Sequence, residues 1–171
     1  MAPNTPLRIG AFDLATKSGF AVIELGTSQI IESGMQNLIP KSPLPDKFHL
    51  LSNLVNDLHD RHALGAIITE APNPFMTRSM ENARIALGLN THAEYLAAAL
   101  GLDFLQPLST STLKKHAATL IGEPKATKGK TQAIQAATDL LGRKPIDDNE
   151  ADAVVLAHWA SLNVELKEGS D

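Results

Sequence analysis

The sequence predicts a single α/β domain in which helices cover both faces of a mixed five-stranded sheet. First, the chain has 171 residues, of which 43% are hydrophobic, so it is long enough for one sizeable core and short for two ordinary domains. Second, three apolar segments joined by short links open the chain, which predicts an antiparallel meander. Third, apolar runs then alternate with segments of helical periodicity, which predicts parallel strands joined by helices.

The expected strands are short apolar runs bounded by turn residues. Those of the meander cover residues 7–13, 19–25 and 29–38, and two further strands are expected at 63–69 and 103–106. The run at 63–69 is apolar almost throughout, which is typical of a strand buried on both faces. The first and fourth strands each lead directly to an acidic residue.

The expected helices fill the second part of the chain. Apolar residues at helical spacing predict helices over about 48–58, 77–100, 112–120, 127–141 and 148–163. Thr127 can cap the fourth of these helices. The last helix offers Val155, Leu156, Trp159 and Leu162 for a core-facing side, and Trp159 is expected in the core or at a subunit contact.

The composition excludes several classes of site. The chain has no cysteine, which excludes disulfides, zinc–thiolate sites, cysteine-ligated iron–sulfur clusters and cysteine nucleophiles, and is compatible with a reducing cytoplasm. It has no apolar run of about 20 residues, so no membrane helix is expected. Its first residues do not resemble a secretory signal. We expect disordered tails at 1–6 and 166–171 around one domain at 7–165.

The charge is unevenly distributed along the chain. The net charge is −4, yet residues 107–145 hold seven basic and two acidic residues, so this segment carries +5 and the rest carries −9. The basic residues are Lys114, Lys115, Lys125, Lys128, Lys130, Arg143 and Lys144. A polyanion-binding face beside an acidic site has this asymmetry. From charge alone, a solvated helical surface is the favoured explanation.

Four carboxylates occupy positions where catalytic groups are often found. Asp13 ends the first strand and Glu70 follows the fourth, while Asp148 and Asp152 are one turn apart at the start of the last helix. Several buried carboxylates are costly without a cation. Oxygen ligands without cysteine suit Mg²⁺ or Mn²⁺. Two such ions about 4 Å apart would activate a water and stabilise the leaving oxygen of a phosphodiester.

Each acid also has a structural explanation when taken alone. An Asp after a strand is often a turn former, and Asp148 could cap a helix and interact favourably with its dipole. Asp147 and Glu150 are expected to do this. The catalytic interpretation therefore depends on a fold that brings the two strand ends and the last helix together.

Four segments between residues 9 and 160 point to such a fold. They are IGAFDLATKSGFAVIE, AIITEAPNPFM, STLKKHAATLIGEPKATKGKTQAI and DDNEADAVVLAHWA. In this order they resemble the first hairpin, the strand-end Glu with its aromatic loop, the basic segment and the closing acidic helix of RuvC-type Holliday junction resolvases. The last segment is most similar to phage-borne and related resolvases. The resemblance covers about residues 7–163 and implies a ribonuclease H-like fold.

The resemblance also implies a metal site. Asp13 and Glu70 match the family's metal-binding acids, and Asp152 completes the site. Cellular members of the family have an Asp or His three residues before the last Asp, and Asn149 occupies that position here. Asn149 can offer a carbonyl oxygen but no charge. Asp148 is the alternative, and the sequence does not choose between them.

The basic segment carries the lysines that match the family. Lys114 resembles the lysine that follows an apolar residue, and either Lys128 or Lys130 fits the second family lysine. These groups would hold the scissile phosphate or neutralise charge in the transition state. Lys115 and Lys125 would contact backbone phosphates. A solvated helix face is the alternative for all five.

Two further features follow from the resemblance. Phe75 resembles the loop aromatic that stacks on a base at the junction centre, and the alternative is an ordinary core residue. The Ala-rich helix after Thr77 resembles the family's dimer helix, and the alternative is packing on the sheet. The implied assembly is a homodimer.

The implied function is a metal-dependent endonuclease that resolves four-way DNA junctions by paired symmetric nicks. Water attack would leave 5′-phosphate and 3′-hydroxyl ends, with Mg²⁺ as the cofactor, Mn²⁺ able to substitute, and two ions expected. The implied location is the cytoplasm of a bacterial or phage-infected cell. Alternatives are a nuclease of this fold acting on other branched DNA or on RNA, and a sugar kinase or actin-like ATPase, for which the chain is short. A non-catalytic junction-binding relative is a further alternative, which Asn149 favours.

Overall fold

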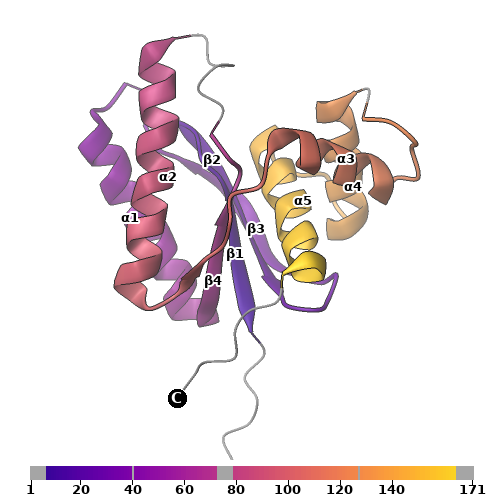
Figure 1. Ribbon diagram of the computed structural model, residues 1–171, viewed down its shortest axis with the longest axis horizontal. Coiled ribbons are helices and arrows are strands. Elements are labelled where there is room, and N and C mark those ends of the chain that lie inside the picture. Colours follow the sequence, from indigo (N-terminus) through magenta and orange to yellow (C-terminus); the bar gives the residue numbers. More distant parts are fainter. Residues whose placement is uncertain (1–6, 40, 73–78, 127, 165–171) are drawn as a thin grey trace, which may run out of the picture.

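The computed structural model describes residues 7–39, 41–72, 79–126 and 128–164. The elements in chain order are β1 (Arg8–Asp13), β2 (Lys17–Glu24), β3 (Ile30–Asn37), α1 (Leu44–His62), β4 (Leu64–Thr69), α2 (Met80–Leu100), β5 (Asp103–Phe104), α3 (Thr110–Leu120), α4 (Gly129–Leu141) and α5 (Asp148–Asn163) (Figure 1). The expected tails, together with Phe75, Thr77 and Thr127, lie outside the described residues.

The sheet has the predicted mixed topology. Its strand order is β3-β2-β1-β4-β5, with β1–β2 and β2–β3 antiparallel and β1–β4 and β4–β5 parallel. The meander and the two parallel strands are therefore confirmed. β5 is shorter than expected because only Asp103 and Phe104 pair with β4.

Parallel pairing brings two strand-end acids to the same edge. Phe12 pairs with Thr69, so Asp13 and Glu70 follow side by side at the carboxyl ends of β1 and β4. The Glu70 amide donates a hydrogen bond to the Phe12 carbonyl at 3.2 Å. In the antiparallel direction, Asp13 pairs with Gly19 of β2. The position of both acids thus follows from strand register.

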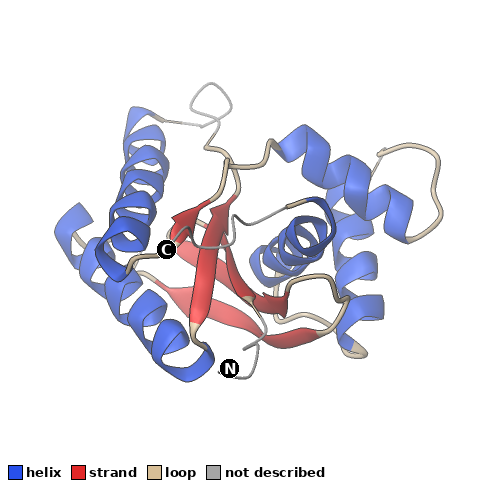
Figure 2. Ribbon diagram, turned by 60° about the horizontal axis from the view of Figure 1, so that its bottom comes forward, coloured by secondary structure: helices blue, strands red, loops and turns tan. Residues whose placement is uncertain are grey.

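Helices cover both faces of the sheet (Figure 1 and Figure 2). α1 and α2 pack on one face against Phe12, Val22 and Ile67, and α5 packs on the other against Ile9 and Ala11. Side chains of β1 alternate between the two clusters because successive strand residues point to opposite faces. α3 and α4 lie outside α5. None of the helices in the described ranges is long and apolar enough to cross a membrane.

α5 is almost wholly buried because it lies between the sheet and the two outer helices. Val155 and Leu156 are fully buried, and Trp159 packs partly buried against the same cluster. Leu162 was expected in the core and is 55% exposed, because it points away from the sheet near the end of the helix.

Helix caps explain where most of the helices begin. Asp147 caps α5, and its Oδ1 accepts hydrogen bonds from the amides of Asn149 and Glu150, as expected. Ser109 caps α3 in the same way, so α3 begins two residues before the predicted start. The cap position of α4 is Lys128 rather than Thr127, and the Lys128 side chain makes no capping hydrogen bond.

An imidazole pair joins α3 to α5. His116 Nε2 lies 3.0 Å from His158 Nδ1, and His158 Nε2 lies 3.2 Å from the Ser28 hydroxyl in the turn after β2. Burial and the neighbouring His158 lower the pKa of His116 to about 4, and burial lowers the pKa of His158. The folded state therefore favours neutral imidazoles.

Acid is expected to destabilise the protein through this pair. Because the unfolded imidazoles titrate near pH 6.5, the unfolded state binds more protons below that pH, and the free energy of unfolding falls between pH 6.5 and about 4. The expected loss is about 1–2 kcal/mol, discounted for the partial exposure of His116. Urea unfolding of the wild type and of His116→Gln at pH 7.5 and pH 5 measures it as the difference between the two proteins, because protonation of Asp152, whose pKa is about 7, acts in the opposite direction in both. A His116→Gln variant should lose less stability over the same interval, and an equal loss would contradict the assignment.

Candidate metal centre

Three carboxylates from three elements meet at the edge where β1 and β4 end. Asp13 is the last residue of β1, Glu70 follows β4, and Asp152 lies on the second turn of α5. Each offers an oxygen, and these oxygens all lie within 4.8 Å of one another. The sequence placed all three as candidate metal ligands, and the fold brings them together. We call these three residues the acidic triad.

The acidic triad is electrostatically strained without a cation. Burial, and then the charge of Glu70, raises the pKa of Asp13 well above its usual value. Burial, and then Glu70 and Asp148, raises the pKa of Asp152 to about 7. Burial also raises the pKa of Glu70, despite a hydrogen bond from Thr110 and the charge of Lys114. A hard divalent cation such as Mg²⁺ or Mn²⁺ fits this oxygen-only set and would relieve the repulsion.

Lys114 and Lys130 lie within electrostatic reach of the triad. Lys130 forms an ion pair with Asp148, and both lysines lower the pKa of Asp152. The stem of Lys114 lies against the start of α4, where a Cβ on Gly129 would be 2.9 Å from its Cε. Among the described residues, Lys128 is not one of the lysines that lower the pKa values of these carboxylates most. Its backbone amide donates a hydrogen bond to the Gln132 side chain. The geometry therefore favours Lys130 over Lys128 as the second lysine beside the acids.

Asp148 and Asn149 have different surroundings. The Asp148 side chain is 37% exposed, and its hydrogen bond with Lys130 lowers its pKa. Its charge raises the pKa values of Asp13 and Asp152, so it lies close to the triad. Asn149 is turned to the helix cap, where its Nδ2 donates to Asp147 Oδ2 at 3.0 Å. Of the two alternatives, Asp148 is therefore the one whose charge interacts with the other acids.

The remaining predicted lysines lie in a separate hollow. Lys115 and Lys125 are exposed and line a surface hollow of about 420 Å³ between α3 and the loop that follows it. Gln132 holds this loop on α4, because its Nε2 donates to the Lys125 carbonyl at 2.9 Å and to the Glu123 carboxylate. The loop that would carry Phe75 lies outside the described residues.

Several residues of the site escaped the sequence analysis. Thr110 donates a hydrogen bond to Glu70, and the charge of Lys17, at the start of β2, helps to lower the pKa of Asp148. Glu150 was expected only to favour the helix dipole, yet its side chain is fully buried and ion-paired with Arg143. The only sequence signal for Thr110 is a second hydroxyl beside the Ser109 cap. Nothing in the local sequence indicates the partner of Glu150.

The sequence matches no model of a known protein family and no curated protein. Solved structures resemble it over nearly its whole length. Thermus thermophilus RuvC in complex with a Holliday junction substrate is 17% identical, with a TM-score of 0.74, over 91% of this chain and 96% of that one. The chain has a RuvC-like fold. A second structure of Thermus thermophilus RuvC is 16% identical over 89% and 92%, with a TM-score of 0.68.

The RuvC-like fold extends to a eukaryotic protein. The yeast mitochondrial Holliday junction resolvase Ydc2 is 17% identical over 94% of this chain and 80% of that one, with a TM-score of 0.63. The resemblance inferred from the four sequence segments is thus confirmed at the level of the fold. The ribonuclease H-like arrangement of mixed sheet and flanking helices is confirmed with it.

Proposed function

We propose that this chain is a metal-dependent endonuclease that cuts four-way DNA junctions. The observation that carries the proposal is the acidic triad, which forms where β1, β4 and α5 meet on a RuvC-like fold. Structural neighbours that include a RuvC in complex with a Holliday junction substrate and a Holliday junction resolvase support this proposal. A location in the cytoplasm of a bacterial or phage-infected cell stays a prediction.

The residues of the site divide the chemistry between them. Asp13, Glu70 and Asp152 would hold Mg²⁺, with Asp148 or Asn149 completing a site for a second ion. Bound ions supply Lewis-acid stabilisation of the phosphodiester and ready formation of a nucleophile from water. Lys130 neutralises charge on the scissile phosphate, helped by Lys114 or Lys128. Water attacks phosphorus, the bond to the 3′ oxygen breaks, and the products carry 5′-phosphate and 3′-hydroxyl ends.

Branched DNA would be held by a larger surface than the acidic triad. Lys115 and Lys125 lie on the hollow beside α3, where they can contact backbone phosphates. Phe75, outside the described residues, is proposed to stack at the junction centre.

A homodimer would present two triads to symmetry-related strands. The exposed large apolar side chains of α2 are Met80, Leu87 and Tyr95. Their spacing of seven and eight residues places them on one face of the helix. We propose this face as the dimer contact, as the family resemblance implies.

The deciding experiment compares a synthetic four-way junction with a linear duplex of matching sequence. Each is incubated with the chain in Mg²⁺, in Mn²⁺ and in EDTA. Paired symmetric nicks on the junction alone, lost in EDTA, are expected. Binding without cutting would favour a non-catalytic junction-binding protein. Cutting of flaps, single strands or RNA instead would retain the chemistry and change the substrate.

Lys130→Ala is expected to reduce junction cleavage more than Lys128→Ala. Lys130 pairs with Asp148 beside the acids, and removing a charge that stabilises the transition state costs about 10²–10³-fold in rate. Lys128 is not among the charges that shift the pKa values of Asp13, Glu70 or Asp152, so its loss should weaken DNA binding and leave the rate of the chemical step unchanged. Single-turnover cleavage with saturating protein separates the two effects. The opposite ranking would assign the site lysine to Lys128.

Asp148→Asn is expected to impair cleavage, whereas Asn149→Ala is expected to preserve it largely. The charge of Asp148 raises the pKa of Asp152 in the triad, whereas the Asn149 side chain contacts the helix cap. Loss of an outer metal-site group costs about 10–100-fold. Cleavage rates at several Mg²⁺ concentrations measure the effect. Intact cleavage by Asp148→Asn with none by Asn149→Ala would reverse the assignment.

A further inference from the structure

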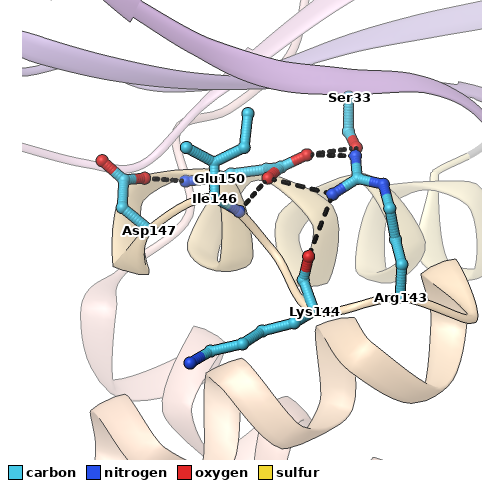
Figure 3. A network of polar contacts seen from close by, with 6 residues as sticks. All are labelled: Ser33, Arg143, Lys144, Ile146, Asp147 and Glu150. Atoms are coloured by element: carbon cyan, nitrogen blue, oxygen red, sulfur yellow. Dashed lines mark hydrogen bonds and ion pairs between the residues drawn. The ribbon is translucent and has the colours of Figure 1, made fainter.

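The buried carboxylate of Glu150 is the centre of a polar network that the proposed chemistry does not use (Figure 3). Its Oε1 accepts hydrogen bonds from the Ser33 hydroxyl of β3 and from Arg143 Nη2, both at 2.6 Å. Its Oε2 accepts a hydrogen bond from the Ile146 amide and lies 3.4 Å from Arg143 Nη1. The carboxylate is therefore held by β3 through Oε1 and by the connection between α4 and α5 through both oxygens.

Arg143 ties the network together. Its Nη2 also donates to the Ser33 hydroxyl at 3.1 Å, and its Nη1 donates to the Lys144 carbonyl at 3.2 Å. The Glu150 side chain is fully buried, whereas that of Arg143 is 48% exposed. A buried charge held by this many partners has few alternative positions, because every rotation would leave it unpaired.

This network lies on the opposite side of α5 from Asp152. The two residues are two positions apart, so their side chains leave the helix about 200° apart. Glu150 points to β3 and Arg143, and Asp152 points to Asp13 and Glu70. Contacts that hold Glu150 therefore fix the rotation of α5 about its own axis, and this rotation determines where Asp152 points.

A close backbone contact holds the same turn of α5 in place. A Cβ on Gly19 of β2 would lie 1.9 Å from the Asn149 carbonyl oxygen and 2.7 Å from the Glu150 amide. Gly19 is the residue that pairs with Asp13 across β1 and β2. The first turn of α5 thus touches the sheet directly beside the first acid of the triad.

We infer that Glu150, held by Arg143 and Ser33, is a positioning residue that sets the rotation of α5 and so places Asp152 in the acidic triad. The inference rests on the proposed function, because it assigns these residues to the assembly of the same metal site. Glu150 itself does not touch substrate or metal. Glu150 contributes by fixing the position of the metal ligand Asp152, which lies about half a turn around the helix.

The test measures Mn²⁺ binding to the metal-free protein by the electron paramagnetic resonance signal of free Mn²⁺. The Glu150→Gln variant is expected to bind at least tenfold more weakly than the wild type, because an amide cannot accept from all the donors around it. Arg143→Lys and Ser33→Ala should weaken binding less and in that order. These milder variants carry the test if Glu150→Gln does not fold.

A stability control separates positioning from general weakening of the fold. Leu51 is fully buried in the cluster under α1, on the other face of the sheet. Leu51→Ala should lower the melting temperature while leaving the Mn²⁺ affinity unchanged. Unchanged affinity in folded Glu150→Gln, or an equal loss of affinity in Leu51→Ala at a matched melting temperature, would overturn the inference.

The metal dependence of cleavage gives a second readout. A higher Mn²⁺ concentration should restore cleavage by Glu150→Gln, because this variant keeps all three carboxylates of the acidic triad. It should not restore cleavage by Asp152→Asn, which lacks one of them. Failure of rescue in Glu150→Gln would count against a positioning role. If the wild type does not bind Mn²⁺, or if Asp152→Asn binds it as the wild type does, the proposed metal site itself is wrong and the inference falls with it.

Discussion

Asp13→Asn is expected to abolish junction cleavage and, in the absence of divalent ions, to stabilise the protein. Burial, and then the charge of Glu70, raises the pKa of Asp13 well above its usual value. Because the folded pKa lies above the unfolded value, the charged form costs stability at every pH above the unfolded pKa, and asparagine removes that cost. The same substitution removes a metal ligand, for which a loss of at least about a thousandfold in rate is expected.

Thermal unfolding in EDTA and in Mg²⁺ measures both sides of this trade-off. In EDTA at pH 7.5, Asp13→Asn should gain about 1 kcal/mol, a rise of about 2–4 °C in melting temperature for a chain of this size. Added Mg²⁺ should stabilise the wild type and leave the variant unchanged. Asp60→Asn, an exposed change on α1, is the matched control and should respond to Mg²⁺ as the wild type does. A lower melting temperature for Asp13→Asn in EDTA would contradict the electrostatic strain.

Gly19→Ala is expected to destabilise the protein strongly and to impair the site. The added methyl would lie 1.9 Å from the carbonyl oxygen and 2.2 Å from the carbonyl carbon of Asn149. Both are backbone atoms, so the clash is relieved only by moving the first turn of α5 away from β2. Overpacking of this kind costs about 3 kcal/mol, and the shift would carry Asp152 away from Asp13.

Gly65→Ala provides the control for Gly19→Ala. There the added methyl would meet the Cδ1 atom of Leu7 at 2.2 Å, and that atom is the end of a side chain that can rotate. Urea unfolding should therefore show a small loss for Gly65→Ala and a large one for Gly19→Ala. Mn²⁺ affinity should fall only in Gly19→Ala. Equal effects of the two substitutions would mean that α5 does not depend on its close approach to β2.

Much of the fold was accessible from local patterns. The meander and the strand at Leu64–Thr69 follow from short apolar runs, and the start of α5 follows from Asp147, because a cap interacts only with amides of its own helix. The acids at the ends of β1 and β4 were predictable as neighbours once the strands were taken as parallel. The error at Leu162 arose because helical spacing identifies a face but not how far along the helix the sheet extends.

The sequence by itself determined which residues could form a metal site and which lysines could accompany it, because residue type and strand ends are local properties. Only the tertiary structure decided that Lys130 pairs with Asp148, that Asn149 turns to the cap, and that Glu150 is buried. The physical reason is that burial and pairing depend on partners far along the chain. Ser33 is 117 residues from Glu150, and no local pattern encodes their contact.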